Sequence, residues 1–184
     1  MRQKRWHKPA ILSAIIATSI IASTIGSHTR IGETDIYPPN DVPGITNPDI
    51  TQSNIQDNIC NPNWHTKSIR PPSSYTSALK IREMQKYNLP GSPSDYELDH
   101  LIALTDGGNP TSEQNLWMQP HNPMSGGAGA SVKDQLEPFV NEKICSREWT
   151  LKQGQECLTN DWFKCYQDNI KVTFGATWID WDDD

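Results

Sequence analysis

The residues best suited to chemistry lie close together in this 184-residue chain. Asp99 and His100 are adjacent, Gly107-Gly108 follows, and Asn115 comes fifteen residues after His100. A histidine that is neutral near pH 7 can take a proton from water. A carboxylate can hold a divalent cation that binds a phosphate and stabilises a leaving oxygen. An asparagine can fix the histidine ring through a hydrogen bond. Together these groups suit the hydrolysis of a phosphodiester.

Two strands and a helix must position these groups. The apolar-rich stretch 96–104 predicts a strand that carries the Asp-His pair, and 106–110 predicts a turn. Residues 115–118 predict a second strand, and the apolar residues of 131–145 recur at helical spacing. Pro138 predicts a kink or break in that helix. Because neighbouring strand side chains face opposite ways, one member of the pair should point toward a metal and the other toward water.

Further helices should flank this unit. Residues 73–88 predict a helix with Ser74 or Thr76 as its N-cap, ended by a Pro- and Gly-rich stretch. Thr150 begins a capping-box sequence for another helix that runs toward residue 158. The mixture of two short strands and separate helices predicts an α+β fold.

The central segment resembles the HNH, or ββα-metal, endonuclease superfamily. About 120 residues are similar to small exported bacterial HNH-type proteins. The motifs that carry the resemblance are Asn47-Pro48, Thr51-Gln52, Ile59-Cys60, Arg70-Pro71-Pro72, Ser74-Tyr75-Thr76, Leu79-Lys80, Tyr96-Glu97-Leu98-Asp99-His100-Leu101-Ile102-Ala103-Leu104, Gly107-Gly108, Asn115-Leu116-Trp117 and Lys133-Asp134…Glu137. The resemblance implies a small ββα-metal core with flanking helices, stapled by disulfides.

The resemblance also implies roles for individual residues. Asp99 would be a metal ligand, His100 the general base and Asn115 the residue that orients it. The third member of the motif has no obvious match in this chain. Asp134 on the helix is the favoured second ligand, and His121 in the preceding loop is the alternative. Mg²⁺ suits a carboxylate-rich site, with Mn²⁺ close behind, whereas a histidine ligand would favour Zn²⁺ or a transition metal.

A local excess of positive charge precedes this segment. Residues 61–90 hold five basic residues and one acidic residue, although the whole chain has a net charge of −6. We expect Arg70 and Lys80, with Lys133 of the later helix, to contact the phosphate backbone of a nucleic acid. A solvated helix face is the alternative interpretation of these cations.

The first 26 residues have the pattern of a secretory signal peptide. A basic head is followed by residues 10–25, which carry no charge. The cleavage signal is weak, so an uncleaved membrane anchor is the alternative. Without residues 1–26 the chain has 12 basic and 22 acidic residues, a net charge of −10. We expect a periplasmic or extracellular protein with a Pro-rich linker at 27–48, a nuclease domain at 49–170 and an acidic tail at 171–184.

Cysteine usage agrees with export. An even number of cysteines in an exported chain predicts two disulfides in an oxidising compartment. Three connectivities are open; the eight-residue spacing of Cys157 and Cys165 is compatible with a bridge, which would leave Cys60 with Cys145.

The function expected from these features is that of an exported, metal-dependent nuclease. It would cut DNA, or alternatively RNA, with low sequence specificity and as a monomer. One alternative is a non-catalytic exported binding domain on a degenerate HNH scaffold. Another is a secreted toxin nuclease with an inhibitor or immunity protein as partner. The acidic balance excludes only tight, non-specific binding over the whole surface and predicts weak, salt-sensitive substrate binding.

Overall fold

A two-stranded antiparallel hairpin lies at the centre of the fold. The computed structural model describes residues 36–122 and 128–171. Strand β1 (Tyr96–His100) pairs with β2 (Leu116–Pro120), and in this register Asp99 lies opposite Trp117. The fold is α+β, as predicted.

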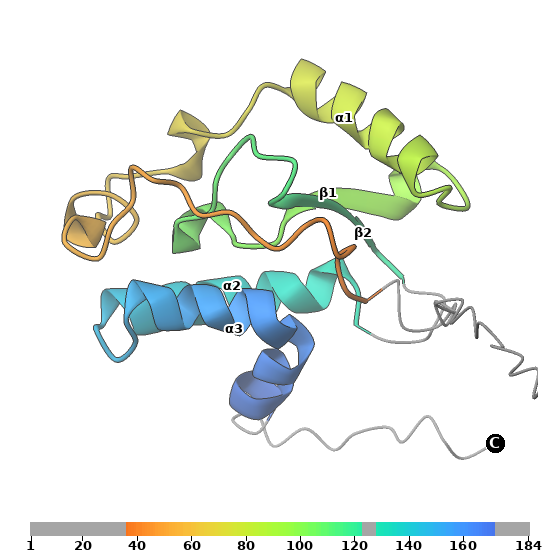
Figure 1. Ribbon diagram of the computed structural model, residues 1–184. Coiled ribbons are helices and arrows are strands. Elements are labelled where there is room, and N and C mark those ends of the chain that lie inside the picture. Colours follow the sequence, from red (N-terminus) through yellow and green to blue (C-terminus); the bar gives the residue numbers. More distant parts are fainter. Residues whose placement is uncertain (1–35, 123–127, 172–184) are drawn as a thin grey trace, which may run out of the picture.

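Helices cover both faces of the hairpin. Helix α1 (Ser73–Lys86) lies on one side, and α2 (Ala130–Cys145) and α3 (Leu151–Tyr166) lie on the other (Figure 1). Within the described part of the chain, none of the helices is both long and apolar enough to cross a membrane. The predicted signal peptide lies outside the described residues, and so does the predicted acidic tail apart from its first residue.

The strands differ from the prediction at their ends. The predicted strand 96–104 stops at His100, because the chain turns into a short 3₁₀ helix at Leu104–Asp106. The backbone of Leu101 still donates to the carbonyl of Asn115, at 2.8 Å. The second strand begins one residue later than predicted and continues to Pro120. The turn between the strands is therefore a long loop, from 101 to 115.

One predicted helix end was wrong, and the break that Pro138 was expected to cause, as the alternative to a kink, is not found. The N-cap of α1 is Pro72, not Ser74 or Thr76, so the helix begins as soon as the Pro-Pro sequence ends. Helix α2 continues through Pro138 without a break. Pro138 is exposed, so the carbonyl that it leaves without an intrahelical partner can bind water.

Helix α3 begins as predicted but extends further. Thr150 accepts a hydrogen bond from the backbone of Gln153, whose side chain accepts one from the backbone of Thr150, which confirms the capping box. The helix runs beyond residue 158 to Tyr166, with one non-helical residue, Asp161 (φ −164°, ψ 85°).

The core lies between the hairpin and the α2–α3 pair. Its most deeply buried side chains come from both helices, from β2 and from the loop after β1: Leu101, Ile102, Trp117, Leu136, Val140, Ile144, Leu158 and Trp162. Helices α2 and α3 approach closely at Gly154, where a Cβ atom would lie 2.4 Å from Ile144 Cδ1. Any residue other than glycine at position 154 would therefore displace Ile144.

One disulfide ties α2 to the segment before α1, and a second lies within α3. Cys60 is bonded to Cys145 at the end of α2, and Cys157 is bonded to Cys165 within α3. This is the pairing that the sequence spacing favours.

The predicted Pro-rich linker is, from residue 36 onward, part of the folded domain. Val42 is only 3% exposed, and the backbone of Gly44 donates to Gln114 at 2.9 Å. Thr46 forms a β-bridge with Gly108, and the Trp162 indole donates to the carbonyl of Ile36 at 3.0 Å. The prediction of a linker at 27–48 therefore fails for 36–48, because backbone pairing and apolar burial fix this segment.

Candidate active site

His100 has a ring whose two nitrogens have different roles. Its Nε2 lies 3.0 Å from the carbonyl oxygen of Pro110. A carbonyl oxygen can only accept, so Nε2 carries the proton and Nδ1 of the neutral ring is an acceptor. No hydrogen bond to Nδ1 is formed by the described residues. The ring is therefore oriented by the backbone and keeps a basic nitrogen available.

The surroundings of His100 favour the neutral ring. The residue is 9% exposed, and this burial holds the pKa of His100 below its ordinary value. The bond to Pro110 opposes this effect in part, and the positive charge of Arg70 adds to it. At pH 7 His100 is thus in the form that can accept a proton.

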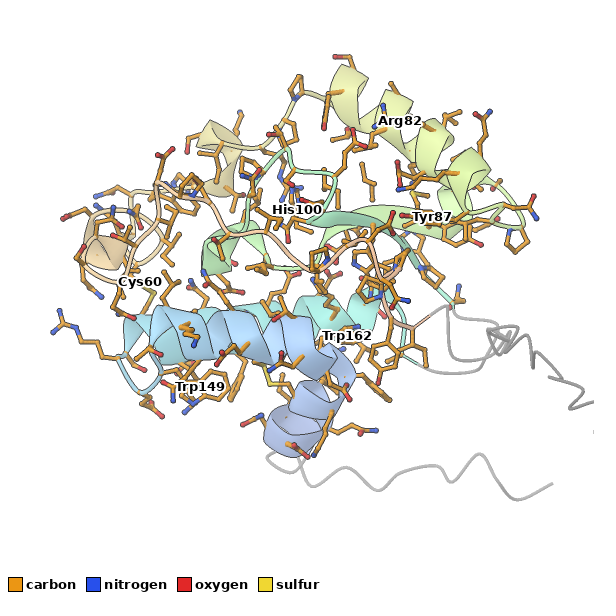
Figure 2. All side chains as sticks on the ribbon, in the orientation of Figure 1. Cys60, Arg82, Tyr87, His100, Trp149 and Trp162 are labelled. Carbon is orange, nitrogen blue, oxygen red and sulfur yellow. A yellow bond between two sulfur atoms is a disulfide. The ribbon has the colours of Figure 1, made fainter. Side chains whose placement is uncertain are left out.

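His100 opens into a cleft of about 600 Å³ on the α1 side of the hairpin. Figure 2 shows His100 on the hairpin, between α1 and the layer that contains Trp162. The lining comes from the loop before α1, the first turns of α1, strand β1 and the residue that follows β2; it includes Arg70, Ser73, Thr76, Lys80, Glu97 and His121. The predicted base and two of the predicted substrate-binding cations therefore share one cleft.

The basic character of α1 is concentrated at this cleft. Arg82 forms an ion pair with Glu113, and Lys86 forms one with Asp41. Lys80 donates to the carbonyl of Tyr96 and lines the cleft. Arg70 also lines the cleft, and it forms no ion pair with a described residue. The positive charge of residues 61–90 is thus partly neutralised away from the cleft and retained beside His100.

Asp99 faces the opposite side, toward α2, as strand alternation predicts. Its Oδ2 lies 2.8 Å from Nζ of Lys133. The same ammonium group lies 2.6 Å from Glu137 Oε1 and donates to the carbonyl of His100 at 2.8 Å. Lys133 is fully buried, at 0% exposure, so its expected contact with substrate is contradicted by the structure.

The three predicted metal ligands do not form a metal centre. The carboxylate of Asp99 is already paired with Lys133, whereas Asp134 and His121 are exposed. The described residues contain no group of three His, Cys, Asp or Glu side chains arranged to hold a metal ion. A cation placed on Asp99 Oδ2 would lie against the Lys133 ammonium. The residues present do not fit the predicted ion.

Carboxylates nevertheless gather near Asp99. Burial, with the charges of Asp99 and Asp134, raises the pKa of Glu97. Burial and Asp99 likewise raise the pKa of Asp134. These shifts reflect acidic surroundings, which the buried cation Lys133 compensates in part.

Asn115 does not contact the His100 ring, so the predicted direct contact is absent. Its side chain accepts from the backbone of Ile102 at 2.9 Å and donates to the carbonyls of Ile102 and Asn109, at 3.1 and 3.0 Å. Asn109 directly precedes Pro110, whose carbonyl binds the ring. Asn115 therefore fixes the loop that holds His100.

Two functional neighbours were not assigned a role from the sequence. The Pro110 carbonyl is a backbone group in a turn and has no residue-type signature. Asp106 was interpreted as a turn residue, yet its carboxyl is fully buried and neither oxygen has a hydrogen-bond partner. Burial and the nearby Glu137 raise the pKa of Asp106 well above its ordinary value. Burial likewise raises the pKa of Glu137, to about 7.

The comparisons with known proteins give no neighbour for this arrangement. The chain matches no protein-family model, no curated protein and no solved structure. The site must therefore be interpreted from its own residues.

Proposed function

We propose that this protein is a nuclease that hydrolyses phosphodiester bonds in the cleft beside His100. The observation that carries the proposal is the His100 ring, buried, kept neutral and oriented so that Nδ1 can take a proton from water. The attacking oxygen would lie in the cleft, within reach of that nitrogen. The sequence motifs support two further parts of the proposal: an HNH-type core and export from the cell.

The remaining cleft residues support a phosphate as the bound group. Arg70 and Lys80 supply positive charge on the wall beside His100. Helix α1 directs its N-terminal turn to this wall through Ser73 and Thr76, and that turn holds no acidic residue. A helix N-terminus favours an anion because its free backbone N–H groups and its dipole both attract negative charge. DNA is the proposed substrate.

A cleavage assay tests the proposal. The protein without residues 1–26 is incubated with supercoiled plasmid and, separately, with single-stranded RNA, in buffers containing Mg²⁺, Mn²⁺ or EDTA. We expect nicked and linear plasmid in at least one buffer. We expect His100→Ala to reduce the rate at least a hundredfold, as removal of a general base does.

The matched control is His65→Ala. His65 is exposed and does not line the cleft, so its loss should leave the rate unchanged. No cutting in any buffer, or equal cutting by wild type and His100→Ala, would contradict the nuclease. A folded protein that binds DNA without cutting it would instead support the binding-domain alternative.

A further inference from the structure

We propose that the ammonium group of Lys133 occupies the place of a divalent cation on Asp99, so that Asp99 holds no metal ion. The inference rests on the proposed function in one respect: it takes the site beside Lys133 to be hydrolytic. It concerns a residue of α2 that lies behind the strand bearing His100.

The first argument is the coordination of the ammonium. Three oxygens surround Lys133 Nζ, from Asp99, Glu137 and the His100 backbone, at 2.6 to 2.8 Å. The His100 carbonyl and Glu137 accept hydrogen bonds from the ammonium group, and Asp99 forms an ion pair with it. The distances suit N–H···O bonds and exceed the 2.0–2.1 Å that Mg²⁺ requires.

The second argument is burial. Lysine is almost never fully buried unless it is paired, and Lys133 is at 0% exposure. Its charge is compensated by the carboxylates of Asp99 and Glu137, which both lie within ion-pair distance of it. Its loss would leave two buried carboxylates unpaired.

The third argument is position. Lys133 and Glu137 are one turn apart on the face of α2 that meets β1, so both reach Asp99 from the helix. A helix residue that approaches a strand carboxylate in this way is where the resemblance would place a metal ligand. In this protein the ammonium group of Lys133 lies at that position. Lys133 also holds the carbonyl of His100, which makes it a positioning residue for the proposed base.

Manganese binding, measured without nucleic acid, tests the inference. Binding is followed by the loss of the free Mn²⁺ signal in electron paramagnetic resonance. We expect wild type and Asp99→Asn to bind the same amount of Mn²⁺. That amount is zero if no carboxylate binds Mn²⁺, and any Mn²⁺ that is bound lies at other carboxylates. Asp134→Asn is the matched control for an exposed carboxylate on α2. Binding of one Mn²⁺ by wild type that is lost in Asp99→Asn alone would overturn the inference.

A second variant tests whether the position itself can take a metal. Lys133→Ala removes the ammonium and leaves Asp99 and Glu137 facing each other. We expect it to bind Mn²⁺ at least tenfold more tightly than wild type, and to be stabilised by it in thermal unfolding. The double variant Lys133→Ala/Asp99→Asn should lose that gain. A folded Lys133→Ala with no gain contradicts the equivalence of ammonium and metal.

The two proposals can fail separately. If Lys133→Ala does not fold, the comparison of wild type with Asp99→Asn decides the inference by itself. Absence of DNA cleavage would reject the nuclease and leave the Mn²⁺ result standing. Mn²⁺ held by Asp99 would reject the inference while cleavage by His100 stood.

Discussion

The chemistry of His100 depends on groups that come from three different segments. The ring contacts the loop carbonyl of Pro110, its backbone contacts Lys133 of α2, and Arg70 lies with it in the cleft. Burial sets the direction of the pKa of His100, and Arg70 lowers it further. As the proposed base, His100 would work over a range that extends below that of an ordinary histidine.

The pH profile of cleavage should show this shift. Because the pKa of His100 is lowered from 6.5, we expect the rate to rise with pH and level off below pH 6.5. Arg70→Ala should move the midpoint upward, since it removes a positive charge, and Lys86→Ala should not. A midpoint above 6.5 in wild type would contradict the assignment. The contribution of neutral His100 to the free energy of unfolding depends on pH in the same direction as the rate. It is complete above pH 6.5 and is lost as the pH falls through the lowered pKa of His100.

Asp106 gives a pH dependence of the opposite sign. Its raised pKa means that the folded protein keeps a proton which the unfolded chain releases above about 3.8. Stability is then complete below that value and is lost as the pH rises. We expect Asp106→Asn, which copies the protonated group, to match wild type near pH 4 and to exceed its melting temperature increasingly from pH 6 to 8. Thermal unfolding at the three pH values measures the difference. A constant difference would mean that Asp106 does not titrate.

The sequence predicted how the strand separates Asp99 from His100, but it did not predict the residues that these two side chains meet. Adjacent residues on a strand must face opposite ways, so the separation of Asp99 from His100 follows from the pattern. The meeting of Asp99 with Lys133 depends on how α2 is rotated against the hairpin, and helix amphipathicity does not determine this. A lysine in a helix is also expected to be exposed to solvent. Its burial here is stabilised by a carboxylate of β1, which a pattern within the helix cannot indicate.

At the scale of elements, the strands and helices were predictable where local signals agree. The Thr150 capping box and the helical period of α2 depend on neighbours within one turn, and both are found. Of the kink or break predicted at Pro138, the break is not found, since exposure lets water bind the freed carbonyl. The predicted linker failed because Val42 and the bridge of Thr46 with Gly108 are long-range contacts, which proline content does not encode.

The two disulfides should stabilise these elements unequally. Cys60–Cys145 joins residues 85 apart, whereas Cys157–Cys165 joins residues 8 apart. In the chain-entropy model the longer loop contributes about 4.5 kcal/mol and the shorter about 2.5 kcal/mol. We expect the Cys60→Ala/Cys145→Ala pair to lose more free energy of unfolding in urea than Cys157→Ala/Cys165→Ala. The reverse order would show that strain or residual structure, not loop length, controls the effect.

At the scale of the whole molecule, the acidic balance limits how the proposed nucleic-acid substrate could be held. Among the predicted cations, Arg82 and Lys86 are used in ion pairs and Lys133 is buried. Arg70 and Lys80 remain at the cleft. Attraction of a polyanion should therefore come from a small part of the surface and should depend on few contacts.

Salt dependence measures the number of these contacts. With two phosphate contacts, the affinity for a labelled DNA duplex should fall roughly tenfold between 50 and 200 mM salt. Arg70→Ala should lower the slope of log Kd against log salt by about one. Lys86→Ala serves as the control and should leave it unchanged. Fluorescence anisotropy provides the Kd values. A steep slope, or an equal effect of both variants, would point to binding over a wider surface.

The segment at 36–48 also determines where the domain can be cut. It runs beside the loop that presents the Pro110 carbonyl, and the backbone of Asn109 donates to Ile45 at 2.8 Å. A recombinant fragment that starts at residue 49 would lack this support and expose the apolar surface under Val42. A fragment for crystallisation or calorimetry should accordingly start no later than Ile36, and proteolytic trimming past that point should lower the melting temperature of the domain.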